Sequence, residues 1–177
     1  TREWHLFDLQ KDPQEMTSLH ADPAYAHILS GMQKRYRDLR QFYDVNSATI
    51  PATRGDESRW AERDRQITQN ARQSDATLAF IGDSITQGWE GNGREVWQQF
   101  YAKRNAINLG IGGDRTEHVI WRLTHGNLGK IQPKVAVLMI GTNNTGHMMQ
   151  DPAEVAAGVE KILEILKEKL PDTQIVL

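Results

Sequence analysis

The sequence contains no cysteine. Disulfides, thiolate nucleophiles and cysteine-ligated zinc or iron–sulfur sites are therefore excluded. Long apolar runs are also missing: the longest, Val135–Ile140, has six residues, whereas a transmembrane helix needs roughly 20. The formal net charge is only -2, so the chain lacks the basic surface that binds nucleic acid. We expect neither a membrane span nor a nucleic-acid partner.

What is present suits a globular domain with an appendage. The chain has 177 residues, of which 38% are hydrophobic and 25% charged, a composition typical of folded domains. It begins with Thr1, and it ends in an apolar run, Gln174–Leu177, that predicts a strand. From these two ends we expect the chain to be a fragment of a longer protein.

A change in composition divides the chain. Residues 44–57 are rich in polar and turn-forming residues and predict a linker between residues 1–43 and residues 58–177. The first part predicts a strand, a turn and a helix that begins at Asp22-Pro23. Apolar residues recur every three or four positions along that helix, which predicts one buried face formed by Ile28, Met32, Tyr36 and Leu39.

The second part alternates between strand and helix patterns. Continuous apolar runs predict buried strands over 77–81, 106–109 and 135–140, and amphipathic segments predict helices over 58–72, 94–102, from 114, and from 151. Capping boxes, at Asp114 to Glu117 and at Asp151 to Glu154, are predicted to open the last two helices. This alternation is typical of an α/β fold with a parallel sheet that helices cover on both faces.

Three polar motifs follow three of the predicted strands. They are Gly82-Asp83-Ser84-Ile85, Gly110-Ile111-Gly112-Gly113-Asp114 and Gly141-Thr142-Asn143-Asn144. Ligands of open parallel sheets bind beyond the carboxyl ends of the strands, so these motifs are expected to meet in one crevice. Each motif alone is a common turn, and only their joint occurrence in this order favours a functional site.

The residue types in these motifs suit nucleophilic catalysis. A serine on a strand-to-helix turn exposes its hydroxyl, and its backbone N–H can stabilise a developing oxyanion. A glycine lets a backbone N–H approach an oxygen closely, because no side chain intervenes. An asparagine side chain can supply a further donor. Together the motifs predict a nucleophile and an oxyanion hole.

These motifs resemble the first three signature blocks of the SGNH hydrolases, the superfamily of GDSL esterases and lipases. The longer run Asn108–Leu123 is similar to the branch that contains the platelet-activating factor acetylhydrolase catalytic subunits. The resemblance covers residues 58–177. It implies a three-layer α/β/α sandwich like that of flavodoxin, incomplete at its C-terminus here, and a serine esterase that needs no cofactor. By the resemblance Ser84 is the nucleophile, and Gly113 and Asn143 complete the oxyanion hole.

One block of the resemblance is missing. The family's general base and its carboxylate partner lie in an Asp-x-x-His block near the C-terminus of the domain, and no such pair follows Asn143. His147 is the one histidine close to the crevice loops in sequence. Loss by truncation explains the missing block better than degeneration does. We therefore expect the 177 residues alone to be nearly inactive.

The first 43 residues resemble the C-terminal subdomain of sulfatases. The resemblance rests on Glu3–Leu9, on Asp12–Glu15 and on Ser18-Leu19. It implies that this segment packs on a missing sulfatase domain, that the parent protein acts on a glycan ester, for example by deacetylating a carbohydrate, and that its location is secreted or periplasmic. The sulfatase active-site motif itself does not occur in this chain.

Two other function classes compete with the esterase. A nucleotide-binding loop fits poorly, because Arg115 stands where a third glycine would be needed and Gly129-Lys130 is followed by Ile131. A non-catalytic module that binds a carbohydrate or a partner protein remains open as long as the base is missing. No histidine and carboxylate cluster has the spacing of metal ligands, so no metal is expected.

Overall fold

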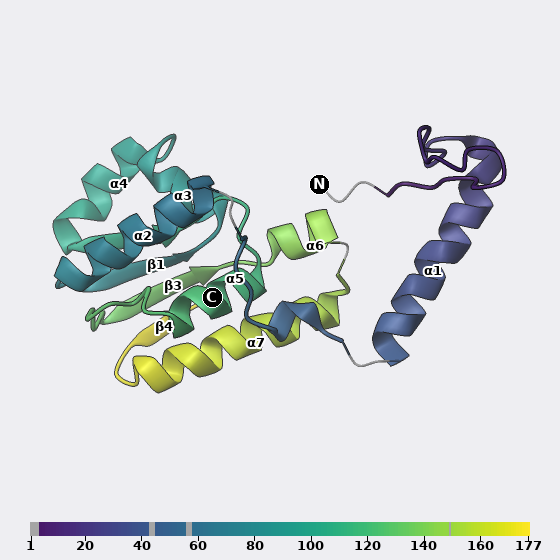
Figure 1. The fold of residues 1–177 in the computed structure, drawn as a ribbon. Helices are drawn as coiled ribbons and strands as arrows, with labels where there is room; N and C mark the ends of the chain where they lie inside the picture. The colour runs from purple at the N-terminus through teal and green to yellow at the C-terminus, as the bar shows by residue number, and fades with distance from the viewer. Residues whose placement is uncertain (1–3, 43–44, 56–57, 149) are drawn as a thin grey trace. The chain divides into compact units, whose positions relative to one another are not determined.

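The apolar runs predicted as strands pair in one parallel sheet (Figure 1). Its order is β2-β1-β3-β4, and the strands are β1 (Leu78–Gly82), β2 (Ala106–Gly110), β3 (Val135–Met139) and β4 (Gln174–Val176). Gly82, the last residue of β1, lies opposite Gly110 on one side and Met139 on the other. The prediction of an α/β fold with a parallel sheet is confirmed.

The structure, a computed structural model, describes residues 4–42, 45–55, 58–148 and 150–177. The chain forms two compact units, Thr1–Asn46 and Ser47–Leu177. The sheet and every residue predicted to act in the site belong to the second unit.

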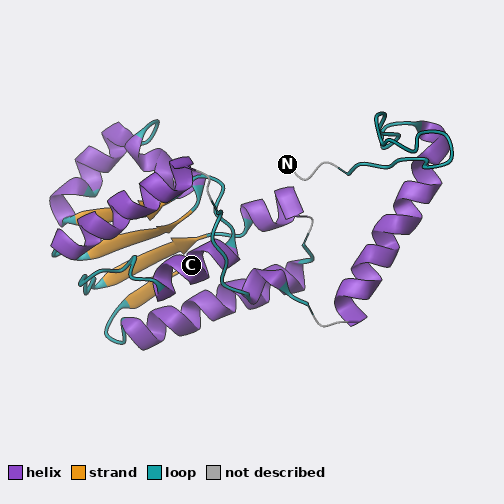
Figure 2. Ribbon diagram, viewed as in Figure 1, coloured by secondary structure: helices purple, strands orange, loops and turns teal. Residues whose placement is uncertain are grey.

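One face of the sheet packs against three helices (Figure 2). They are α2 (Ser58–Gln73), α5 (Thr116–Thr124) and α7 (Pro152–Lys169). Side chains alternate along a strand, so Ala79 and Ile81 of β1 both face this core, where they meet apolar residues of all three helices. Burial of this apolar surface is the main force that holds the unit together.

The other face carries a cluster of aromatic rings. Phe80 points away from the helical core, and its ring centroid lies 5.1 Å from that of Trp97 and 5.0 Å from that of Tyr101. Trp89 completes the cluster. These rings come from β1, from the two short elements that follow α3 (Ser84–Gln87), namely the 3-10 turn Gly88–Glu90 and α4 (Arg94–Phe100), and from Tyr101, the residue directly after α4. The sheet therefore has helical cover on both faces, as predicted.

Residues 47–54, which we call the strap, pack on the second unit. Ala48 lies in the 3-10 turn Ser47–Thr49 and is completely buried. Its carbonyl accepts a hydrogen bond from the Thr116 hydroxyl at 2.8 Å, and the Ala52 N–H donates to the carbonyl of Glu117. Composition predicted a linker over 44–57, but residues 47–54 are bound to α5. The prediction missed these contacts because backbone groups make them, and the side-chain composition of the segment does not indicate them.

The first unit contains a 3-10 turn, Pro23–Tyr25, and the helix α1 (Ala26–Phe42). The Asp22 side chain accepts a hydrogen bond from the Ala24 N–H, as expected of a cap before Pro23. Among the described residues of this unit no β-strand occurs, and in the segment predicted as a strand the Leu6 carbonyl accepts a backbone hydrogen bond from the Leu19 N–H. The apolar stripe of α1 is exposed rather than buried, at Ile28, Met32, Tyr36 and Leu39.

Two helix boundaries differ from the sequence prediction, and one helix was not predicted. The capping box at Asp151 opens α7 as predicted. Helix α5 starts one residue later than predicted, with Arg115 as its N-cap, because the Asp114 carboxylate turns inward to Trp60 and Arg122. The His118 ring accepts a hydrogen bond from the Arg115 N–H, but the arginine side chain has no acceptor, so the predicted capping box does not form. The motif after β3 forms a helix, α6 (Thr142–Met148), and α4 is followed by a separate 3-10 turn, Ala102–Arg104.

Candidate active site

The three polar motifs meet at one end of the sheet. They follow the adjacent strands β1, β2 and β3, whose last residues are paired in register. The Ile111 N–H donates to the Gly82 carbonyl at 3.2 Å, which carries the pairing one residue beyond β2. A side chain at Gly110 would lie 2.4 Å from the Gln87 nitrogen. Only glycine at this position lets the first two motifs come this close.

Ser84 is the first residue of the short helix α3 (Ser84–Gln87) and is exposed. Asp83 before it is buried, and its carboxylate accepts a hydrogen bond from the Ile85 N–H at 2.9 Å. This cap fixes the turn that presents the Ser84 hydroxyl. Ser84 borders an open hollow of about 460 Å³, which is also lined by Gln87, Gly88, Glu90, Gly91 and Asn92.

The Gly112-Gly113 loop lies beside Ser84. A Cβ placed on Gly112 would be 3.8 Å from the Ser84 Cβ, and the Gly112 N–H donates to the Gln87 side chain at 2.7 Å. Gly113 has a φ of +78°, a conformation that favours glycine. Among the described residues its N–H donates to no acceptor. A half-buried donor of this kind is available to an oxygen atom of a ligand.

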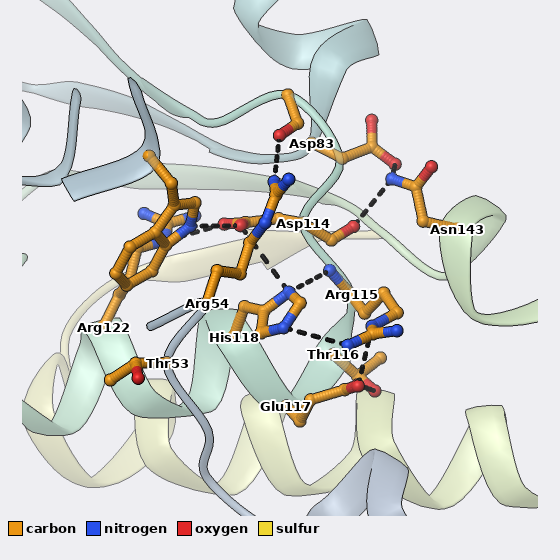
Figure 3. A network of polar contacts seen from close by, with 12 residues as sticks. Thr53, Arg54, Asp83, Asp114, Arg115, Thr116, Glu117, His118, Arg122 and Asn143 are labelled. Carbon is orange, nitrogen blue, oxygen red and sulfur yellow. Dashed lines mark hydrogen bonds and ion pairs between the residues drawn. The ribbon is translucent and has the colours of Figure 1, made fainter. Parts of the chain in front are cut away.

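Asn143 lies in α6 and is buried. Its amide nitrogen donates to the backbone carbonyl of Asp114 at 2.7 Å and to the Asp83 carboxylate at 3.3 Å (Figure 3). The side chain thus joins the three motifs. Both amide hydrogens have protein acceptors here, and the longer bond to Asp83 is the weaker of the two.

Burial shapes the charge of Asp83. Removal of the carboxylate from water raises its pKa, while the hydrogen bond from the Ile85 N–H lowers the pKa and partly offsets that effect. No arginine or lysine forms an ion pair with Asp83 among the described residues. Its partners are therefore the neutral donors of Ile85 and Asn143.

A buried ion pair between Asp114 and Arg122 lies next to the site (Figure 3). The Asp114 carboxylate accepts hydrogen bonds from Trp60 at 2.7 Å and from Arg122 at 2.8 Å. Arg122 is completely buried and also donates to the carbonyls of Leu109 at 3.0 Å and Gly82 at 3.4 Å. Burial raises the pKa of Asp114, and the positive charge of Arg122 opposes that shift.

His118 lies close to this pair but does not behave as a general base. Burial, and after it the charge of Arg115, lowers its pKa to about 3. Its Nδ1 accepts a hydrogen bond from the Arg115 N–H at 3.1 Å, and its Nε2 lies 3.2 Å from the Arg115 guanidinium. The ring is occupied with structural contacts and stays neutral at pH 7.

The other histidines have different surroundings. His125 follows α5, and its ring stacks on Trp121 with a centroid distance of 4.3 Å. His5 and His20 belong to the first unit. His147 lies in α6, the helix that also carries Asn143, and its side chain is outside the described residues.

The described ranges contain neither a metal site nor a membrane-spanning helix. No group of three or more histidine and acidic side chains is arranged to hold a metal ion. No described helix is both long and apolar enough to cross a membrane.

Sequence reasoning missed two polar residues that shape the site. Gln87 holds the Gly112 N–H, and Arg54 of the strap donates to the Gly112 carbonyl. A helix spacing of three residues from Ser84 could have indicated Gln87, because such residues share a face. No local pattern indicates Arg54, which lies 58 residues from its partner.

Comparison with known proteins agrees with this geometry. The sequence profile of the GDSL-like Lipase/Acylhydrolase family matches residues 80–177. The chain belongs to this family. Its profile match does not include residues 1–43, and the comparisons give no support to a sulfatase segment there.

Curated proteins with similar sequences also match the chain. The chain is 34% identical over 137 residues to the platelet-activating factor acetylhydrolase IB subunits alpha1 from Bos taurus and alpha2 from Homo sapiens. Each match covers 76% of this chain and 57% or 58% of the relative. The chain therefore spans somewhat more than half the length of these relatives.

Solved structures share the fold. A protein from Streptococcus pneumonia that is named after platelet activating factor superposes with a TM-score of 0.57 at 22% identity, covering 67% of this chain and 53% of that one. A GDSL-like lipase from Bacteroides thetaiotaomicron gives a TM-score of 0.50 at 21% identity, with 65% and 56% covered.

Proposed function

We propose that the protein hydrolyses carboxylic esters, with Ser84 as the nucleophile. The observation that carries this proposal is the exposed Ser84 beside the Gly112-Gly113 loop, in which the Gly113 N–H has no acceptor among the described residues. A nucleophile next to an unused donor is the arrangement that acyl transfer needs. Membership of a lipase and acylhydrolase family supports the same chemistry.

The proposed reaction proceeds in two halves. The Ser84 oxygen attacks the ester carbonyl and loses its proton to a base, and the carbonyl oxygen becomes an oxyanion. The N–H groups of Ser84 and Gly113 donate to that oxyanion. Collapse breaks the ester C–O bond, and the alcohol leaves with the proton that the base took from Ser84. Water, deprotonated by the same base, then attacks the acyl-enzyme, which releases the acid and returns the proton to Ser84.

Asn143 is proposed as the third oxyanion donor. For this role its amide exchanges the 3.3 Å hydrogen bond to Asp83 for one to the substrate oxygen, while the 2.7 Å bond to the Asp114 carbonyl keeps the amide in place. An oxyanion is a stronger acceptor than a neutral carbonyl, so the exchange is most favourable in the transition state.

The general base is proposed to be the histidine of an Asp-x-x-His block in the full-length protein. His118 is buried, and both of its ring nitrogens contact Arg115, so it is not proposed as the base. The curated relatives are longer than this chain, so their fold includes segments that the match does not cover. An Asp-x-x-His block in the full-length reading frame would support this part of the proposal.

The substrate is proposed to carry a short acyl group such as acetyl. The relatives reported above are named acetylhydrolases, and the hollow in front of Ser84 is open and lined by small and polar residues. Carbohydrate acetyl esters stay a prediction from the sulfatase resemblance. Assays of the full-length protein on acetylated and deacetylated glycans would test it.

The proposal is tested by Ser84→Ala in the full-length protein. Loss of the nucleophile should lower the rate of p-nitrophenyl acetate hydrolysis by about 10⁴ to 10⁶. The matched control is Ser30→Ala, which changes an exposed serine of α1 and should leave the rate unchanged. A fluorophosphonate probe should add its mass to the peptide that contains Ser84.

Two outcomes would contradict the proposal. Ser84→Ala could retain the activity of the unchanged protein, or the probe could label a different serine. If the full-length protein hydrolyses no ester and binds acetylated glycans, the crevice is a binding site and the non-catalytic alternative is correct.

A further inference from the structure

Arg54, the last residue of the strap, contacts the loop that carries the proposed oxyanion donor (Figure 3). Its Nη1 donates to the Gly112 carbonyl oxygen at 2.5 Å. The guanidinium also covers Gly113, because a Cβ at that position would lie 2.7 Å from Nη1. A charged side chain therefore holds the peptide that joins the two glycines.

The position of this peptide determines where the Gly113 N–H points. A trans peptide is planar, so the Gly112 carbonyl and the Gly113 N–H belong to one rigid group and point in opposite directions. Glycine on both sides gives this peptide unusual freedom to rotate. Gln87 holds the preceding N–H of Gly112, and Arg54 holds the carbonyl that follows it.

We propose that Arg54 is a positioning residue for ester hydrolysis: by binding the Gly112 carbonyl, it aims the Gly113 N–H at the oxyanion of the substrate. A cationic donor on the carbonyl also polarises the peptide, which makes the N–H on its other side a stronger donor. This inference rests on the proposed function, since it assigns Arg54 to the same reaction.

The strap is anchored well enough to present Arg54 in one place. Ala48 is buried under α5, and the Thr116 hydroxyl and the Glu117 carbonyl bind the backbone of the strap at Ala48 and Ala52. Residues between Ala52 and Arg54 span too short a distance to move far from these anchors. The strap backbone that carries Arg54 is therefore ordered when the protein folds, and its conformational entropy is lost before any substrate binds.

The test compares Arg54→Met, Arg54→Lys and a control in the full-length protein. The control is Arg65→Met on α2, which removes an exposed arginine that pairs only with Glu62 among the described acidic groups. For each variant, kcat and KM are measured with p-nitrophenyl acetate. Inhibition is measured with an alkyl trifluoromethyl ketone, which forms a tetrahedral oxyanion on an active serine. Circular dichroism shows that each variant is folded.

Arg54→Met removes the hydrogen bond to the Gly112 carbonyl and should lower kcat about 10- to 100-fold. This decrease is smaller than the one expected when an oxyanion donor itself is removed. KM should stay within about twofold, because the donor acts mainly in the transition state. Inhibition by the trifluoromethyl ketone should weaken by the same factor as kcat. Arg54→Lys should restore most of the loss, and Arg65→Met should equal the unchanged protein.

Several results would overturn the proposal. Arg54→Met could keep its kcat, or lose kcat while the trifluoromethyl ketone binds as before, or lose activity that lysine does not restore. If Arg54→Met does not fold, Arg54→Gln gives the same comparison with a neutral donor. Ser84→Ala separates the two proposals: if it is inactive while Arg54→Met is fully active, only the role of Arg54 fails, whereas an active Ser84→Ala overturns both.

Discussion

A single buried histidine makes the stability of this protein depend on pH. His118 has almost no exposed surface, and burial together with the charges of Arg115, Arg54 and Arg122 lowers its pKa from 6.5 to about 3. The Asp114 carboxylate lies 3.8 Å from the His118 ring, but it is already paired with Arg122 at 2.8 Å. In the unfolded chain the same histidine binds a proton below pH 6.5.

The free energy of unfolding should therefore fall as the pH decreases below 6.5. Above that pH His118 is neutral in both states and contributes no slope. Between 6.5 and 3 only the unfolded state binds the proton, so His118 alone should cost roughly 2 kcal/mol between pH 7 and pH 5. Urea unfolding at several pH values measures this loss.

His118→Gln should abolish that part of the pH dependence, because glutamine does not titrate. Carboxylates with raised pKa values, such as those of Asp83 and Asp114, act with the opposite sign and are present in both proteins, so the difference between the two curves isolates His118. An NMR titration in which the His118 ring protonates near pH 6.5 in the folded protein would contradict the prediction.

At this scale, sequence reasoning reached the residues of the site that belong to local motifs. Ser84, Gly113 and Asn143 lie in short motifs whose composition and order are visible in the sequence, and their catalytic roles stay predictions. Gln87 and Arg54 were missed because their importance depends on tertiary contacts with Gly112. Such contacts leave no periodic pattern.

The elements are joined by one arginine. Arg122 of α5 donates to Leu109 of β2 and to Gly82 of β1, and it pairs with Asp114 in the loop after β2. A helix is thereby fixed to the carboxyl ends of two strands at the point where the site begins. All of these groups are buried, so each depends on the others for its hydrogen bonds.

Arg122→Met should destabilise the protein by about 3 to 5 kcal/mol, because it leaves the Asp114 carboxylate buried without its cation. Denaturant unfolding measures the change. Arg65→Met is the control, since its exposed ion pair with Glu62 should contribute less than about 1 kcal/mol. A loss of similar size in both variants would show that the buried pair has no special role.

The strands and most helices could be predicted because their apolar periodicity is strong. The start of α5 was displaced by one residue, since Asp114 is used in the core instead of as a cap. Helix α6 was missed because Gly141-Thr142-Asn143-Asn144 has the composition of a loop. In α6 the buried Asn144 amide donates to the side chains of Thr116 and Gln150. These tertiary contacts stabilise the helix, and the helix propensities of the residues alone do not indicate them.

At the scale of the whole molecule, the hydrolase unit matches only part of its relatives, 57% to 58% of their length. The proposed nucleophile and the proposed oxyanion donors lie within residues 84–143, and the proposed base does not. If the proposal is correct, the base belongs to a segment outside residues 1–177.

We therefore expect residues 1–177 alone to hydrolyse p-nitrophenyl acetate at least about 10⁴ times more slowly than the full-length protein. The comparison is made on samples that circular dichroism shows to be folded. Comparable rates in the two proteins, abolished by Ser84→Ala in both, would place the base within residues 1–177 and contradict the proposed Asp-x-x-His block.

Domain boundaries taken from the family match would cut this unit in the wrong place. The match begins at Phe80, inside β1, and a composition-based boundary at Ser58 would still omit the strap. A truncated or fused enzyme that starts at either point loses Arg54, and one that starts at Phe80 also loses the Trp60 donor to Asp114. The hydrolase unit should be transferable to another protein only when it is taken from Ser47 onward.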